Sequence, residues 1–294
     1  LWVSLEQGNL DQNVKWEPAM QRLTVKRYLS LSAESLSVPE SERPELLIWP
    51  ETAMPFDYQT APELSAAIRA FARDRRVALL FGAPGFRNRG DGVVDAFNRA
   101  YLIAPNGVGE GWYDKEHLVP FGEYVPPFLD LPFLRPLLQG VGEFLPGEST
   151  GPLVLPATPQ LSPDRGPLVL GVLICYESIF PELARKQVSQ GATLLVNISN
   201  DAWFGRSSAP EQHLSLGILR AVEQRRWIAR STNTGISAFV DPTGAVKAES
   251  LSHPVVPLTE KSVFFTLEPW LPWAGLALFL TFFAPVLSRF RRHI

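Results

Sequence analysis

The 294-residue sequence predicts a mixed α/β domain that is followed by one membrane helix. Three observations lead to this fold class. Short apolar runs of strand length alternate with longer segments of helical periodicity, as in layered α/β proteins. Two turns of hairpin type, APNG and DPTG, predict that antiparallel strands extend the sheet. An uncharged and mostly apolar run near the end of the chain is typical of a membrane span.

The elements of the α/β domain follow one another along the chain. Strands are expected at about residues 2–6, 45–49, 77–82, 97–104, 168–175, 192–198 and 236–240. Helices are expected at about 18–35, 62–75, 179–190 and 210–229. The two hairpin turns cover 104–107 and 241–244. From Tyr124 to Pro146 an apolar segment is broken by prolines and glycines, which predicts either a lid that meets lipid or a loop packed on the domain.

The uncharged run extends from Leu271 to Leu287, with tryptophans at its start and three arginines after it. A buried core helix is the alternative, but these flanking residues favour a transmembrane helix at 268–288. The arginines place the tail, 289–294, in the cytoplasm and the α/β domain, 1–267, on the outer side of the membrane. Leu1 lies inside an alternating strand pattern, so we expect the natural protein to begin further upstream.

Composition argues against several classes of partner and cofactor. Lys and Arg total 27 against 30 Asp and Glu, without a basic stripe, so nucleic acid is not an expected partner. A single cysteine excludes an internal disulfide and a cysteine-rich zinc site. The four histidines are scattered without metal-ligand spacing, so neither a metal nor another cofactor is expected.

Reactive side chains follow several of the predicted strands. Cys175 ends the apolar run LVLGVLIC, Glu51 follows ELLIWP, and Lys115 and Glu123 lie in WYDKEHLVPFGEYVP. Each residue has an ordinary interpretation: a buried cysteine, a helix-capping or surface glutamate, and a solvated charge pair. Together they form a set in which a carboxylate is the general base, an ammonium stabilises an oxyanion and a thiol is the nucleophile.

Five spaced motifs strengthen this interpretation: WPETAMP, KEHLVPFGEYVP, CYES, NISNDAWFG and RSTNTGISA. Their order resembles the nitrilase (carbon–nitrogen hydrolase) superfamily and is most similar to its apolipoprotein N-acyltransferase branch. The resemblance implies an αββα sandwich in the periplasm, attached to the bacterial inner membrane. It also implies an acyltransferase that moves the sn-1 acyl chain of a phospholipid, through a cysteine thioester, to the N-terminal diacylglyceryl-cysteine of an apolipoprotein. Members of this branch carry a bundle of membrane helices ahead of the domain, which this sequence does not contain.

The resemblance also implies a role for each candidate residue. Glu51 would be the base, Cys175 the nucleophile, and Lys115 with the backbone N–H of Tyr176 would hold the oxyanion. Glu123 would orient the lysine. Tyr176, Glu177 and Trp203 would line the substrate pocket, although Trp203 also fits a plain core position.

Two other functions are compatible with the sequence. A nitrilase-type amidase would use the same three catalytic residues on a small amide, but it has no use for a membrane helix or an apolar lid. The second is a membrane-anchored binding module whose catalytic triad has lost its activity. All three positions keep a reactive residue type, which argues against this function.

Overall fold

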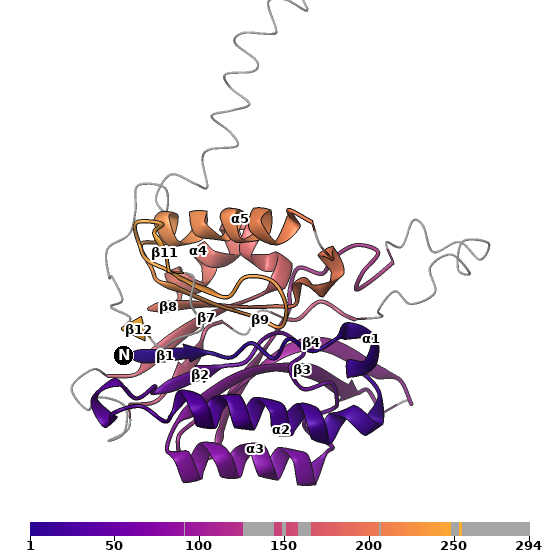
Figure 1. Cartoon of the computed structure of the whole chain (residues 1–294). Helices are drawn as coiled ribbons and strands as arrows, with labels where there is room; N and C mark the ends of the chain where they lie inside the picture. Colours follow the sequence, from indigo (N-terminus) through magenta and orange to yellow (C-terminus); the bar gives the residue numbers. More distant parts are fainter. Residues whose placement is uncertain are drawn as a thin grey trace, which may run out of the picture.

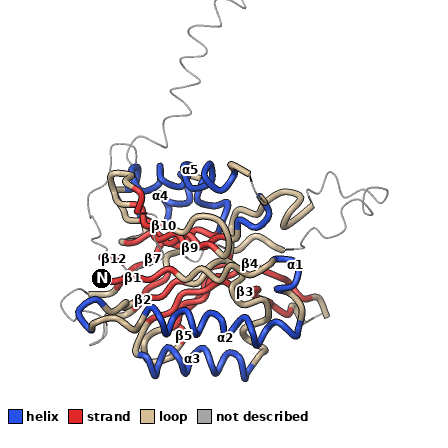
Figure 2. Tube along the Cα trace, viewed as in Figure 1, coloured by secondary structure: helices blue, strands red, loops and turns tan. Residues whose placement is uncertain are grey.

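The computed structural model describes residues 1–90, 92–125, 144–148, 151–157, 166–205, 207–247 and 253–254. In this part of the chain two six-stranded sheets pack face to face, and helices cover the outer face of each (Figures 1 and 2). The four layers therefore follow the order αββα, which is the nitrilase-like arrangement expected from the motifs.

The first sheet has the strand order β12–β1–β2–β3–β4–β5. Its strands are β1 (Trp2–Leu5), β2 (Leu46–Ile48), β3 (Ala78–Asn88), β4 (Val94–Ile103), β5 (Gly109–Asp114) and β12 (His253–Pro254). Helices α2 (Pro18–Ser35) and α3 (Pro62–Arg75) cover its outer face in Figure 1. The short helix α1 (Gln12–Lys15) precedes α2, and a 3₁₀ turn, η1 (Glu40–Glu42), precedes β2.

The second sheet has the strand order β11–β10–β9–β8–β7–β6. Its strands are β6 (Leu153–Leu155), β7 (Leu168–Ile174), β8 (Leu194–Ser199), β9 (Ile228–Thr232), β10 (Ala238–Val240) and β11 (Val246–Lys247). Helices α4 (Pro181–Ser189) and α5 (Ala209–Gln224) cover it on the outside (Figure 1). Two 3₁₀ helices follow strand ends: η4 (Cys175–Ile179) after β7 and η5 (Asp201–Phe204) after β8.

The central strands are apolar on both faces because each face meets another layer. In β2, Leu46 and Ile48 join the core between the two sheets, whereas Leu47 joins the core under α2 and α3. In β8, Val196 lies in the core between the sheets and Leu195 packs under α4 and α5. Strands buried on both sides are typical of parallel sheets covered by helices.

Strand direction brings the candidate residues to one edge of the sandwich. Strands β1, β2 and β3 are parallel, and so are β7, β8 and β9. Each of β4 and β5 is antiparallel to the strand before it, so β5 runs in the same direction as β3. Glu51 comes shortly after β2, Lys115 directly after β5 and Cys175 directly after β7. The carboxyl ends of the strands are where α/β sheets present reactive groups.

Most of the expected elements are confirmed within a few residues, and both hairpin turns join neighbouring antiparallel strands. The helix expected at 210–229 is too long: α5 ends at Gln224, Arg225 adopts a left-handed φ of 52°, and β9 begins at Ile228. Residues 228–229 belong to β9, a strand that the sequence did not predict. β6 and β12 were also missed, whereas β5 and β11 were expected only as the partners of the two hairpin turns, without residue ranges.

Two expectations fall on residues outside this description. They are the transmembrane helix at 268–288 with its tail at 289–294, and most of the apolar segment between Tyr124 and Pro146. Among the helices of the described residues, none combines the length and the hydrophobicity that crossing a membrane requires.

Candidate active site

Cys175 occupies a tight turn between β7 and η4. Its φ angle of 52° lies in the left-handed region, which costs a residue with a Cβ about 1–3 kcal/mol. The side chain is partly buried beside Ser199, whose hydroxyl interacts with it. Burial and the nearby Glu51 raise the pKa of the thiol to about 12, although Lys115 and Ser199 oppose this change. The sulfur is therefore a thiol at neutral pH and needs a base before it can attack.

Glu51 lies in a turn that is packed tightly against β3. A Cβ on Gly82 would lie 2.5 Å from the backbone nitrogen of Thr52, so only glycine allows this approach. Thr52 itself has a left-handed φ of 48°. Burial raises the pKa of the Glu51 carboxyl; Lys115 opposes this change and Glu123 adds to it. A carboxyl with a raised pKa is a stronger base toward a thiol than an ordinary surface carboxylate.

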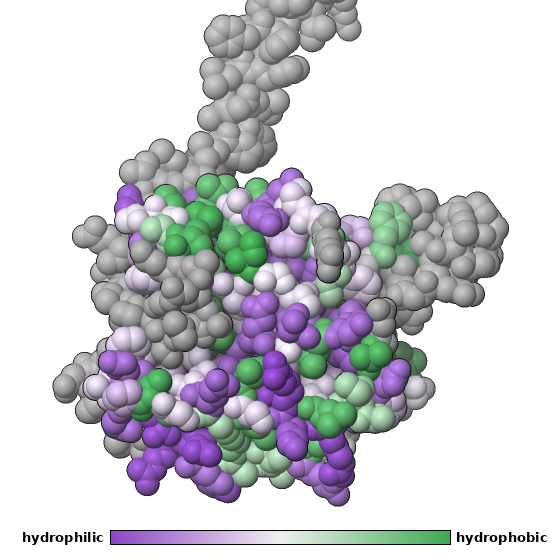
Figure 3. All heavy atoms as spheres, viewed as in Figure 1, coloured by the Kyte–Doolittle hydropathy of each residue, from purple (hydrophilic) through white to green (hydrophobic). Residues whose placement is uncertain are grey.

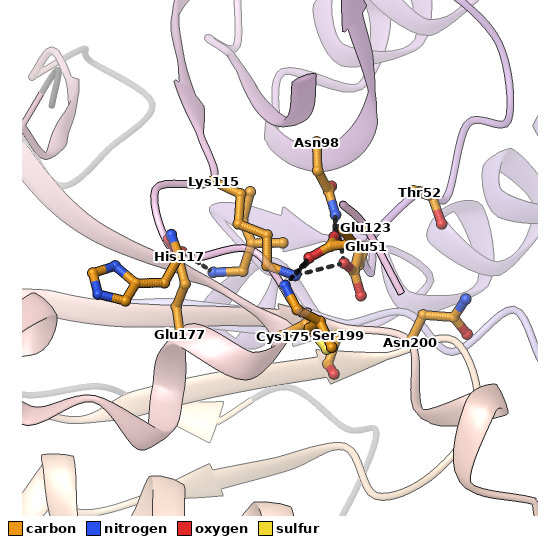
Figure 4. Close-up of polar contacts among 12 residues, drawn as sticks. Glu51, Thr52, Asn98, Lys115, His117, Glu123, Cys175, Glu177, Ser199 and Asn200 are labelled. Carbon is orange, nitrogen blue, oxygen red and sulfur yellow. Dashed lines mark hydrogen bonds and ion pairs between the residues drawn. The ribbon is translucent and has the colours of Figure 1, made fainter. Parts of the chain in front are cut away.

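Lys115 lies between two carboxylates. Its Nζ is 2.8 Å from Oε2 of Glu123 and 3.6 Å from Oε1 of Glu51, and the side chain is almost fully buried. Burial alone would lower the pKa of the lysine, but Glu51, Cys175 and Glu123 outweigh it and raise that pKa. Lys115 therefore remains an ammonium next to the sulfur, where it can stabilise a developing oxyanion. Figure 4 shows Lys115, Glu51 and Glu123 converging above Cys175.

Asn98, in β4, joins the two carboxylates and was not among the predicted site residues. Its Nδ2 donates to Oε1 of Glu51 at 2.7 Å and to Oε1 of Glu123 at 2.8 Å (Figure 4). Glu123 also accepts the backbone N–H of Val119 at 2.8 Å. These contacts hold Glu123 against Lys115.

Lys15 is a second buried cation that the sequence did not single out. It ends α1, and its Nζ donates to Oγ1 of Thr52 at 2.7 Å. Burial lowers the pKa of Lys15 to about 8, whereas the charge of Glu51 opposes that change. Its positive charge in turn favours the carboxylate form of Glu51.

A cavity of about 700 Å³ opens over these residues. Its wall includes Glu51, Asn98, Lys115, Glu123, Cys175, Trp16, Phe121, Phe144, Tyr176, Trp203, Phe204 and Leu216. Tyr176 and Trp203 thus lie on the cavity wall, as expected. Trp203 is 71% exposed, so the plain core position is wrong for this residue. The polar groups gather at the floor, and most of the remaining wall is apolar or aromatic, as in many ligand sites.

Glu177 lies elsewhere than expected, because its side chain does not reach the cavity. The 3₁₀ turn buries it completely, with Oε1 accepting the N–H groups of Glu116 and His117 and the hydroxyl of Tyr113. Its Oε2 accepts the N–H of Ile174 at 2.7 Å. Burial raises the pKa of Glu177 to about 7, although these N–H groups and Lys115 oppose the change. Glu177 therefore connects the backbone next to Lys115 with the backbone next to Cys175.

Glu177→Gln is expected to destabilise the fold by about 1–3 kcal/mol, because the new NH₂ group must face a buried N–H donor. Urea unfolding followed by circular dichroism measures this change. Glu40→Gln, at an exposed position in η1, is the matched control and should change the stability by less than about 0.5 kcal/mol. Equal stability of Glu177→Gln and the wild type would contradict this role.

Among the described residues, no group of three or more His, Cys, Asp or Glu side chains is arranged to hold a metal ion. The wall of the candidate site carries the Cys175 thiol, the Glu51 and Glu123 carboxylates, the Lys115 ammonium and the Asn98 amide. These groups suit a nucleophilic attack on a carbonyl carbon.

Curated relatives share the sequence over most of its length. An apolipoprotein N-acyltransferase from Geobacter metallireducens is 44% identical over 83% of this chain and 44% of its own length. One from Azotobacter vinelandii is 35% identical over 99% of this chain and 54% of its own length. The chain therefore spans about half the length of these relatives.

Solved structures share the fold at low sequence identity. A carbon-nitrogen hydrolase from Helicobacter pylori has a TM-score of 0.58 at 17% identity, covering 86% of this chain and 85% of its own. A variant of the amidase from Nesterenkonia sp. AN1 has a TM-score of 0.57 at 19% identity, covering 87% and 89%. That amidase carries the acetamide moiety of fluoroacetamide, covalently added at its active-site cysteine.

The model of the carbon-nitrogen hydrolase family matches residues 9–253, a range that contains Glu51, Lys115 and Cys175. The match covers far more than half of the sequence and, apart from β1 and the end of β12, contains the two sheets and their helices. The chain belongs to the carbon-nitrogen hydrolase family.

Proposed function

We propose that this chain is the catalytic part of an apolipoprotein N-acyltransferase. It would move an acyl chain from a phospholipid to the N-terminal amine of a diacylglyceryl-cysteine at the start of an apolipoprotein. The proposal rests on one observation: Glu51, Lys115 and Cys175 lie close together on the wall of one cavity. The names of the relatives, aligned over 83–99% of the chain, support the choice of acceptor.

In the first half-reaction Glu51 accepts the thiol proton and Cys175 attacks the sn-1 ester carbonyl of the phospholipid. The Lys115 ammonium and the N–H of Tyr176 stabilise the oxyanion that forms. When the tetrahedral intermediate collapses, the carbon–oxygen bond breaks and Glu51 returns the proton to the leaving lysophospholipid. The acyl chain then remains on the sulfur as a thioester.

In the second half-reaction the amine of the acceptor attacks the thioester carbonyl. The same two groups stabilise the second oxyanion, and Glu51 accepts the proton that the amine loses. The carbon–sulfur bond breaks, the product is an amide, and the sulfur regains the proton. The fold of the Nesterenkonia amidase, with its covalently modified cysteine, is compatible with such an intermediate.

The surface around the cavity favours a lipid substrate. Trp16, Phe121 and Trp203 are 42%, 51% and 71% exposed on its wall. Apolar side chains also gather over α5 (Figure 3), where Leu216 and Leu219 are exposed. A soluble enzyme for small amides gains nothing from exposed aromatic groups of this size. The domain would lie at the periplasmic face of the bacterial inner membrane.

The test uses the purified chain in detergent micelles with a phospholipid labelled in its sn-1 acyl chain and a synthetic diacylglyceryl-cysteine peptide. The label should move to the peptide amine, and lysophospholipid should appear in equal amount. A peptide with an acetylated N-terminus is the control, which should leave the label on Cys175. Release of the label only as free fatty acid, or rapid hydrolysis of butyramide, would indicate a hydrolase instead.

Lys115→Met is expected to slow both half-reactions by about 10²-fold or more, because it removes the charge that faces each oxyanion. It also leaves Glu51 and Glu123 facing each other across Asn98 without the ammonium that lies between them. Single-turnover mass spectrometry measures thioester formation and its loss to the peptide separately. Slowing of only one step would show that Lys115 does not serve both oxyanions.

A further inference from the structure

The peptide group between Cys175 and Tyr176 is held from one side. The carbonyl oxygen of Cys175 accepts hydrogen bonds from Oγ of Ser178 at 3.0 Å and from Nδ2 of Asn197 at 3.3 Å. The ring nitrogen Nε2 of His213 lies 3.1 Å from the same oxygen. This oxygen thus has three polar partners, an unusual number for one carbonyl group.

These contacts also determine the direction of the Tyr176 N–H. A trans peptide is planar, so its C=O and N–H bonds point in opposite directions. Groups that hold the Cys175 oxygen on the side of α5 and β8 therefore direct the Tyr176 N–H to the other side, where the cavity lies. An N–H at the start of a 3₁₀ helix has no partner inside that helix, so it is free for an oxyanion.

The three groups on this oxygen are themselves fixed by a buried charged network. Nδ1 of His213 lies 3.1 Å from Oδ1 of Asp201, and Nη2 of Arg230 donates to Oδ2 of Asp201 at 2.9 Å. Arg230 also donates to Oδ1 of Asn197, which fixes that amide. Ser199 donates to Asp201 at 2.8 Å. Burial opposes ionisation of Asp201, but His213 and Arg230 outweigh it and hold the pKa of Asp201 below its usual range.

Both arrangements of the His213 ring that suit this network place a proton on Nε2. As a neutral ring, His213 accepts from Arg230 through Nδ1, which lies 3.1 Å from Nη2. As an imidazolium, it donates to Asp201 through Nδ1. In each case Nε2 donates toward the Cys175 carbonyl, so this contact does not depend on the charge of the ring.

We infer that the Asp201–His213 pair, together with Asn197 and Ser178, is a positioning network that orients the Cys175–Tyr176 peptide as part of the oxyanion hole. His213 acts through that peptide and does not serve as the base for the thiol, because its Nε2 contacts are the Cys175 carbonyl and the Ser178 hydroxyl. The network also holds Cys175 in its left-handed conformation. This inference rests on the acyl-enzyme chemistry of the proposed function.

Two reagents separate orientation of the peptide from reactivity of the sulfur. With p-nitrophenyl butyrate, Cys175 forms a thioester through an oxyanion and releases p-nitrophenolate. With iodoacetamide, it forms a thioether by displacing iodide, and no oxyanion arises. In both reactions Glu51 accepts the thiol proton. Loss of peptide orientation should therefore slow only the reaction with the ester.

His213→Ala is expected to slow acylation by the ester about 10- to 100-fold and to change alkylation by iodoacetamide less than about twofold. His213→Gln offers an amide donor to the same carbonyl and should recover part of the loss. Ser178→Ala removes a smaller donor and should show the same selective effect, more weakly, if His213→Ala does not fold. His117→Ala, whose ring is partly exposed, is the matched control and should keep the wild-type ratio of the two rates.

Equal slowing of both reactions, or no slowing of either, would overturn the positioning role. If the ester does not acylate the wild-type chain, the proposed acyl-enzyme mechanism is wrong, and this inference fails with it. If the wild type is acylated by the ester but does not transfer lipid acyl chains to the peptide, only the proposed substrates are wrong. The two failures are therefore distinguishable.

Discussion

Cys175→Ala should form no acyl adduct with phospholipid, and transfer to the peptide should fall to the uncatalysed level. The variant lacks the sulfur that would carry the acyl chain, and Cys175 is the only cysteine in the sequence. Incubation of the wild type with phospholipid alone should instead add the mass of one acyl chain, which neutral hydroxylamine removes. Intact-protein mass spectrometry measures both results.

Cys175→Ser gives the control for this experiment, since it keeps a nucleophilic atom in the same strained turn. A serine ester resists neutral hydroxylamine, so any adduct on this variant should persist after treatment. Acylation should be far slower than in the wild type, because a hydroxyl gives up its proton less readily than a thiol. A hydroxylamine-sensitive adduct on Cys175→Ala would place the acyl chain on another residue.

The sequence predicted Glu51 and Cys175 as candidate catalytic residues because each follows the end of a hydrophobic strand. Glu51, Lys115 and Cys175 come after β2, β5 and β7, and strands that run in the same direction bring such positions to one edge. The apolar runs for β2 and β7 were recognisable because they are buried on both faces. β5 contains few apolar residues and was expected only as the partner of the APNG hairpin turn, so Lys115 was found mainly through its motif.

The supporting residues could not be predicted in the same way. Asn98 lies inside β4 next to Arg99, and polar side chains are also common in an ordinary half-buried strand. His213 and Asp201 belong to α5 and η5, and they meet below Cys175 only because the helix packs across the strand ends. Contacts of this kind depend on how the layers pack, which local periodicity does not encode.

The direction of the Glu177 side chain could not be predicted either, because it depends on one backbone turn. Two residues after the nucleophile, it was expected on the cavity wall. The 3₁₀ turn of η4 instead rotates its side chain beneath the floor, where four donors surround it. A strand that continued by one more residue would have pointed the same side chain elsewhere, so the sequence alone could not settle its direction.

Glu51→Gln should slow acylation of Cys175 by about 10²- to 10⁴-fold, because an amide cannot accept the thiol proton. The substitution keeps the size of the side chain, and its oxygen can still accept the hydrogen bond from Asn98. The Cys175 thiol, with its pKa raised to about 12, would then depend on solvent for deprotonation. Stopped samples analysed by mass spectrometry give the rate of adduct formation.

The pH dependence of the acylation rate tests Glu51 as the base without relying on the magnitude of the rate loss. The pKa of Glu51 is raised by burial, so protonation should remove the base as the pH falls through that raised value. Wild-type acylation should therefore decline on the acid side, at a higher pH than an ordinary glutamate would give. Glu51→Gln should lack this decline, since an amide does not titrate there. If the variant instead keeps both the wild-type rate and the acid limb, the base is another carboxylate, and Glu123 is the nearest candidate because its carboxylate also contacts Lys115 and Asn98.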